Sequence, residues 1–230
     1  PENTLVMVGM LDGTGLEQII TFDHTEHPPT LNGRQTVQDK LNRTTILVAH
    51  NAAHDLMWLW ESGFTYNGEV FDTMLGEYIL QRGQKEPLSL EACAERHQLH
   101  TKKQDTLKEY FKQGLNVSEI PHDELSEYLS ADLHATQQLF RHQDKEYTFG
   151  KGKTLLDTIR LTNQLAVHLA RIYQRGFKVD LTVLEEVRKE FEQEKQELTV
   201  KLEEQVHELM GDRPINLNSP EQLSWIIYSR

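Results

Sequence analysis

Short apolar runs bounded by turn residues occupy the first third of the chain. Residues 5–10 and 19–22 form two such runs, and the glycine-rich stretch between them is typical of a hairpin turn. A third run, at 45–49, leads directly into a helical pattern with an apolar face at 55–60. The pattern therefore predicts a strand hairpin, followed by a buried strand that is joined tightly to a helix.

Helical periodicity dominates the chain beyond this point. Residues 70–73 fit one more short strand before a helix at 74–81, and the pattern from 89 to about 150 is helical. Strands first, followed by alternating strand and helix, indicate an α/β fold in which helices pack on a mixed sheet.

The C-terminal part of the chain has a different hydrophobic pattern. The segment 146–154 contains two glycines and fits a linker, and an amphipathic helix at 155–175 precedes a much longer one that ends at Gly211. We therefore divide the chain into an α/β domain at 1–150 and an all-α region of long antiparallel helices at 151–230.

Composition narrows the classes of protein that fit. Hydrophobic residues make up 37% of the chain, enough for a sizeable core, and no run reaches the roughly 18 apolar residues of a membrane helix. The net charge of −12 argues against a general nucleic-acid coat, but not against an enzyme that holds a nucleic-acid end locally. The single cysteine, Cys93, excludes a disulfide framework and favours a reducing compartment.

Two spaced pairs of side chains are candidates for chemistry. Asn51 and Asp55 follow the end of the buried strand, and Tyr128 and Asp132 lie four apart in a helix, so that both can face one cleft. Each pair alone has a plain structural interpretation: Asp55 as a residue of a helix start, and Tyr128 as a half-buried core side chain. The combination, in this order and on these elements, is far more specific.

These pairs resemble the second and third motifs of the DEDD 3′–5′ exonucleases, tyrosine subtype. The resemblance rests on three stretches: His50-Asn51-x-x-x-Asp55, Phe71-Asp72-Thr73-Met74 and Tyr128-x-x-x-Asp132. Two later stretches, 175–180 and 216–223, resemble the passage where family A DNA polymerases enter their polymerase half, and the phage-type members look most similar. The resemblance implies a ribonuclease-H-like mixed sheet with flanking helices at 1–150, and helices leading into the thumb at 151–230.

The family resemblance also implies a function and roles for individual residues. The chain would be a fragment of a replicative DNA polymerase whose metal-dependent 3′–5′ exonuclease proofreads DNA and is linked to template-directed synthesis. Asp132 and Asp55 would ligate two divalent ions, Mg²⁺ or Mn²⁺, which carboxylates suit as hard oxygen ligands. Tyr128 would orient the attacking water, and His50 and Asn51 would lie at the bound 3′ nucleotide.

The implied partners are DNA, as a single-stranded 3′ end and as a primer-template duplex, and a processivity factor. No membrane is implied, and the expected location is the cytoplasm of a bacterial or phage-infected cell. Lys102 and Lys103 begin a basic stretch that includes Tyr110 and Phe111, and this stretch fits a patch that binds the backbone of single-stranded DNA. A solvated amphipathic helix is the equally supported alternative for the same residues.

One departure from the family pattern leaves alternatives open. The first motif, an Asp-x-Glu on the leading strand, is absent; the Asp-x-Glu at 144–146 follows the third motif and lies on the wrong element. We expect the missing motif and its strand upstream of Pro1, in preference to a degenerate nuclease domain kept as a structural or DNA-binding module. A ribonuclease D-like exoribonuclease is the other alternative, and the stretch 216–223 argues against it.

Overall fold

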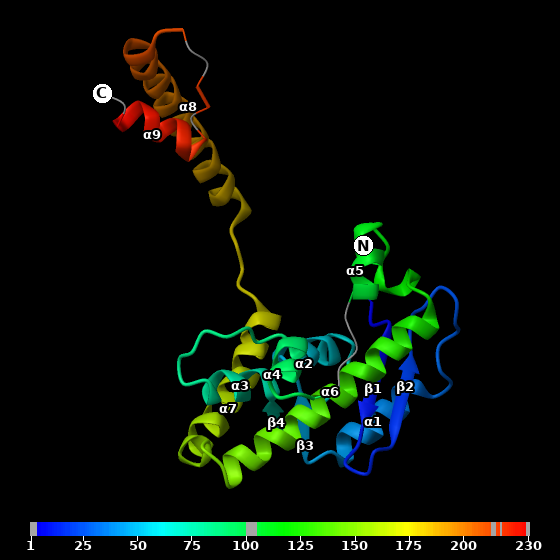
Figure 1. Ribbon diagram of the computed structural model, residues 1–230. Coiled ribbons are helices and arrows are strands. Elements are labelled where there is room, and N and C mark those ends of the chain that lie inside the picture. Colours follow the sequence, from blue (N-terminus) through cyan, green and yellow to red (C-terminus); the bar gives the residue numbers. More distant parts are fainter. Residues whose placement is uncertain (1–3, 100–104, 213–214, 217, 229–230) are drawn as a thin grey trace. The chain divides into compact units, whose positions relative to one another are not determined.

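The computed structural model describes residues 4–99, 105–212, 215–216 and 218–228. The chain divides into two compact units, Pro1–Gly176 and Phe177–Arg230. The described strands are β1 (Met7–Leu11), β2 (Glu17–Thr21), β3 (Ile46–Ala49) and β4 (Glu69–Asp72). The helices of the first unit are α1 (Gly33–Arg43), α2 (Ala52–Glu61), α3 (Thr73–Leu80), α4 (Leu90–Arg96), α5 (Asp105–Lys112), α6 (His122–Thr148) and α7 (Leu156–Arg175), and those of the second unit are α8 (Leu181–Met210) and α9 (Pro220–Tyr228) (Figure 1).

The described strands form two small sheets. β1 and β2 are antiparallel, with Met7 opposite Thr21, as the hairpin pattern predicts. β3 and β4 are parallel, with Ala49 opposite Asp72, and α2 makes the connection between them. The predicted α/β composition is confirmed, but the described strands do not join into the single mixed sheet that the sequence pattern suggests.

Helix α6 runs across both sheets of the first unit and packs against β1, β2 and β3 (Figure 1). Its approach to β1 depends on Gly9, where an added Cβ would come within 2.8 Å of the side chains of Leu129 and Leu133. A similar close approach occurs at Gly76 of α3, where a Cβ would lie 2.6 Å from Gln143 Oε1 of α6. The glycines at these crossings let α6 lie directly against β1 and α3.

Three hydrophobic clusters hold these layers together. The largest joins β2, α1, α2 and the loop after α2, with Ile20, Val37, Leu41, Leu56, Phe64 and Tyr66. A second cluster lies between α4 and α6 and contains Cys93, which is fully buried. A third cluster, of Leu107, Ile120 and Leu125, packs α5 and the start of α6 against Val6 and Met7, where β1 begins.

The first compact unit continues past residue 150, where the sequence pattern suggests a boundary. Helix α7 packs against α2, α3 and β4, and its buried Asn163 accepts a hydrogen bond at 3.2 Å from the backbone N–H of Asp72. This helix therefore contributes to the packing beneath the end of β4.

The described elements of the second unit are the helices α8 and α9. The carboxylate of Asp180 accepts hydrogen bonds from the N–H groups of Thr182 and Val183 and so caps α8, and Gly211, at φ 66°, ends it. Ser219 precedes α9 and accepts a bond from Gln222 N–H at 3.4 Å. In the described part of the chain, no helix combines the length and the apolar character needed to cross a membrane.

Candidate active site

A single buried carboxylate organises the junctions at the ends of β3 and β4. Asp72, 1% exposed, ends β4 and accepts hydrogen bonds from the backbone N–H groups of Asn51 at 3.0 Å and Ala52 at 2.9 Å. It also accepts bonds from the N–H groups of Met74 at 2.9 Å and Leu75 at 3.3 Å. Asp72 thus caps both α2 and α3, and it fixes where α2 begins.

The capping by Asp72 sets the conformation of Asn51. Asn51 adopts a left-handed backbone, with φ 68° and ψ 51°, which asparagine tolerates better than most residues. Its N–H group turns toward Asp72, and its side chain lies exposed at the start of α2. Asp55 follows one turn later and is also exposed, so the two predicted residues lie at one end of α2.

His50 holds the same junction from the other side. Its Nδ1 lies 2.9 Å from Thr73 Oγ1 and its Nε2 lies 2.8 Å from the carbonyl oxygen of Leu88. Because a carbonyl only accepts, Nε2 carries the proton and Nδ1 accepts. Burial lowers the pKa of His50, which favours this neutral ring. Both ring nitrogens are engaged within the protein, so the predicted substrate contact has no free ring nitrogen to use.

Asp55 stands in a different environment from Asp72. It makes no hydrogen bond or ion pair within the described residues. Solvent reaches its side chain, yet the surrounding protein displaces enough water to raise its pKa to about 7, and the negative charge of Asp72 adds to the shift. A carboxylate in such a place gains most from a nearby cation.

Tyr128 and Asp132 meet on one face of α6, as their four-residue spacing predicts. Burial raises the pKa of Tyr128 further above its ordinary value, and the charge and hydrogen bonding of Asp132 act in the same direction. Burial also raises the pKa of Asp132, although the hydrogen bond from Tyr128 partly offsets this. Tyr128 therefore keeps its proton at neutral pH and can donate or orient a hydrogen bond, but it cannot serve as a general base.

These side chains alone do not complete a metal site. Within the described residues, no group of three histidine, cysteine, aspartate or glutamate side chains is arranged to hold a metal ion. The chemistry of Asp55 and Asp132 suits a hard divalent cation, since both are carboxylates whose pKa is raised. Two carboxylates are too few to hold the ions, and further ligands would be needed.

Lys102 and Lys103, which the sequence analysis assigns to a patch for single-stranded DNA, lie outside the described residues.

Sequence reasoning missed a second buried carboxylate, Glu77 of α3. It accepts hydrogen bonds from Arg96 Nη1 at 2.8 Å, His97 Nε2 at 3.0 Å and Gln143 Nε2 at 3.1 Å, which link α3 to α4 and α6. Burial acts to raise the pKa of Glu77, but the bonds from His97 and Arg96 outweigh it and hold the pKa below its ordinary value. No local pattern marks Glu77, because its partners lie 19 to 66 positions away.

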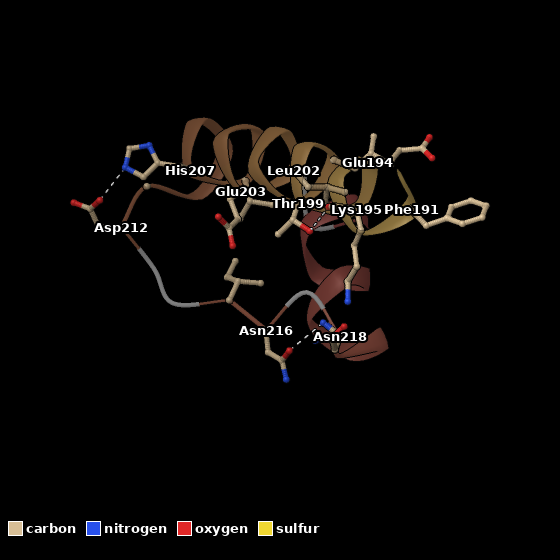
Figure 2. Close-up of a pocket in the computed structure, with 14 residues that line it drawn as sticks. Phe191, Glu194, Lys195, Thr199, Leu202, Glu203, His207, Asp212, Asn216 and Asn218 are labelled. Atoms are coloured by element: carbon tan, nitrogen blue, oxygen red, sulfur yellow. Dashed lines mark hydrogen bonds and ion pairs between the residues drawn. The ribbon is translucent and has the colours of Figure 1, made fainter. Parts of the chain in front are cut away.

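The second unit has a groove of its own, with about 950 Å³ of open space between α8 and the segment that leads to α9. Figure 2 shows Lys195 extending from α8 toward Asn218, and His207 paired with Asp212 at 2.8 Å. The floor is apolar, with Leu198, Leu202 and Ile215 among the lining residues. The groove brings together no set of residues that the sequence analysis marks as catalytic.

Comparison with known proteins identifies the family. A family model described as 3′–5′ exonuclease, of the DNA polymerase A type, matches residues 16–147, which is more than half of the chain. The chain belongs to this 3′–5′ exonuclease family. The matched range contains Asn51, Asp55, Tyr128 and Asp132.

Curated relatives of the chain are bacterial proteins named DNA polymerase I. The Bacillus subtilis protein is 26% identical over 197 residues, covering 86% of this chain and 21% of the relative. The Synechocystis protein is 27% identical over 184 residues, covering 80% of this chain and 18% of the relative. The Helicobacter pylori protein is 31% identical over 139 residues, covering 55% of this chain and 14% of the relative.

The chain thus spans about a fifth of the length of the curated relatives it matches, or less. The prediction of a family A polymerase exonuclease fragment is confirmed, while the phage-like placement stays a prediction because these relatives are bacterial.

Proposed function

We propose that the chain is the proofreading exonuclease part of a replicative family A DNA polymerase, followed by the first helices of the polymerase region. One observation carries the proposal: Tyr128 is held against Asp132 on α6 while Asp55 stands without a partner on α2, within the range that matches the exonuclease family. Two carboxylates with raised pKa values and a protonated phenol are suited to phosphodiester hydrolysis at a DNA 3′ end.

In the proposed reaction, water attacks the terminal phosphorus and the bond to the 3′ oxygen of the preceding nucleotide breaks. The products are a nucleoside monophosphate and a DNA strand that is one nucleotide shorter. The hydroxyl of Tyr128 would orient the attacking water, and Asp132 would hold the phenol in place. Two divalent ions, Mg²⁺ or Mn²⁺, would bind at Asp55 and Asp132, and such ions lower the pKa of water and stabilise charge on the phosphate.

The sheets leave room for the ligands that the described residues lack. Among the described strands, β1 pairs only with β2 and β3 pairs only with β4, so each keeps a free edge beneath α6. We place the expected Asp-x-Glu strand between these edges, where it would pair with β1 and β3 and join the two small sheets. Its two carboxylates would then stand near Asp55 and Asp132. This arrangement rests on the family resemblance and on the free edges together.

The test is degradation of 5′-labelled single-stranded DNA by this chain and by a version extended upstream of Pro1, each with Mg²⁺ or with EDTA. We expect degradation only by the extended version, and only with Mg²⁺. A matched single-stranded RNA separates DNA from RNA as substrate: preference for RNA would favour the ribonuclease D-like alternative.

A degenerate nuclease kept as a DNA-binding module is the second candidate. The observation that favours it is the lack of a three-ligand metal group within the described residues. An extended version that binds DNA but degrades none with Mg²⁺ or Mn²⁺ would establish this candidate and remove the catalytic roles. Contacts with a primer-template duplex and a processivity factor, and location in the cytoplasm, stay predictions for the whole protein.

A further inference from the structure

The two tryptophans of α2 have different surroundings. Trp60 packs against the cluster of Leu56 and Phe64, and the guanidinium of Arg171 lies over its ring at 5.3 Å. Trp58 belongs to none of the hydrophobic clusters formed by the described residues, and its side chain is half-buried. Trp60 therefore has a structural role in joining α2 to α7, whereas core packing does not account for Trp58.

Trp58 lies on the same face of α2 as Asp55. It follows Asp55 by three positions and His54 by four, spacings that place side chains beside one another on a helix. The His54 ring meets Trp58 edge to face, with ring centroids 6.4 Å apart and planes at 72°. His54 and Asp55 are both exposed. An aromatic pair thus borders the carboxylate, on the side of α2 that faces away from the core.

We propose that Trp58, held edge-on by His54, is a stacking platform for an unpaired base of single-stranded DNA beside Asp55. The inference rests on the proposed function, because it assumes that a DNA 3′ end reaches this face. Stacking suits the chain's electrostatics, since a net charge of −12 offers little attraction to phosphates and every base presents an aromatic face. An indole accepts any base, as removal of a mispaired nucleotide of any kind requires.

Binding without turnover tests the platform. The probe is a 5′-labelled oligothymidylate of about eight nucleotides in EDTA, within the site sizes of single-strand binders, and the readout is fluorescence anisotropy with the full chain. Trp58→Ala should weaken binding by about 5- to 100-fold, and Trp58→Tyr should restore it to within about threefold, because a phenol also stacks. Phe149→Ala is the matched control: Phe149 is an exposed aromatic at the far end of α6, and its removal should change nothing.

An abasic probe separates stacking from a merely structural role. A probe that lacks the stacked base should bind the wild type as weakly as the normal probe binds Trp58→Ala, and Trp58→Ala should not distinguish the two probes. The platform is wrong if the affinity of Trp58→Ala is within twofold of the wild-type affinity, or if Trp58→Ala distinguishes the two probes as the wild type does. It is also wrong if the wild type binds no oligothymidylate.

The platform and the proposed function can fail separately. Unchanged binding by Trp58→Ala, together with metal-dependent degradation by the extended version, would remove the platform and leave the exonuclease. Loss of binding in Trp58→Ala and rescue in Trp58→Tyr, in a protein whose extended version degrades nothing, would keep the platform and remove the exonuclease.

Discussion

Two pairs of carboxylates in the first compact unit have opposite surroundings. Asp72 and Glu77 are almost fully buried, and each accepts several hydrogen bonds from backbone or side-chain donors. Asp55 and Asp132, on α2 and α6, have raised pKa values, and within the described residues no cationic side chain pairs with either. We call the first pair the supporting carboxylates and the second the raised-pKa carboxylates.

The difference separates stability from function. The donors aimed at Asp72 and Glu77 tie α2, α3, α4 and α6 into one unit, and those at Glu77 favour its charged form. Asp55 gains no such compensation, and at Asp132 the hydrogen bond from Tyr128 offsets only part of the effect of burial, so both lower the stability of the folded chain when they are ionised. A fold keeps such groups where something else supplies the missing charge, and the divalent cations that we propose would supply it here.

The largest expected effect is on activity. In the complete protein, for which we propose both exonuclease and polymerase activity, Asp132→Asn should reduce exonuclease activity by at least about 1,000-fold, because the carboxylate proposed to act only in hydrolysis is lost. Primer extension should be largely unchanged. The measurement is digestion of single-stranded DNA beside extension of a matched primer.

Asp144→Asn is the control for this experiment, since Asp144 is an exposed aspartate on the same helix. Equal loss of digestion and extension in Asp132→Asn would contradict the separation of the two activities.

The largest effect on stability belongs to Asp72. Asp72→Ala leaves four backbone N–H groups at two helix starts without their acceptor, and we expect a loss of about 3–5 kcal/mol in the free energy of unfolding. Asp72→Asn should lose about half as much, because one side-chain oxygen can still accept. Urea unfolding measures both. A loss below about 1 kcal/mol for Asp72→Ala would contradict its role as a double cap.

Glu77 gives a smaller effect with a defined pH dependence. We expect Glu77→Gln to cost about 1–2 kcal/mol at pH 7, because three donors lose a charged acceptor. The pKa of Glu77 is lowered from 4.5, so its contribution is present above that pH and is lost as the pH falls through the lower folded value. Unfolding at a series of pH values should show the two proteins converging below pH 4.5. A difference that stays constant would contradict the assignment.

Replacing Asp55 should change the free energy of unfolding in the opposite direction, and by the smallest amount. Its folded pKa of about 7 lies above the ordinary 3.8, so its penalty is absent below 3.8, grows as the pH rises to about 7, and is constant above. Asp55→Asn should therefore stabilise the metal-free chain at pH 8 by about 1 kcal/mol after allowance for solvent screening, a gain of about 2–4 °C in melting temperature. The variant should match the wild type near pH 4. Destabilisation of Asp55→Asn relative to the wild type at pH 8 would contradict the contrast between the two pairs of carboxylates.

Sequence patterns could predict the local parts of this site but not its supports. The pairing of Tyr128 with Asp132 follows from helical periodicity, and the β3–α2 junction follows from an apolar run that ends in polar residues. The double cap by Asp72 joins residues about 20 positions apart, and no spacing rule predicts which strand ends meet. The sequence also does not predict that the first unit extends to Gly176. The glycines near residue 150 are typical of a linker, and this pattern is the same whether or not α7 packs against β4.

Mg²⁺-dependent stability tests most directly the proposal that the raised-pKa carboxylates, Asp55 and Asp132, bind a divalent cation. The measurement is the melting temperature at pH 8 of the version extended upstream of Pro1, with EDTA or with saturating Mg²⁺, for the wild type and for a variant combining Asp55→Asn and Asp132→Asn. The account predicts that Mg²⁺ raises the wild-type value by about 5–10 °C, as ligand at roughly 100 times its Kd should, and leaves the variant unchanged. Equal shifts in the two proteins, or none in the wild type, would contradict it.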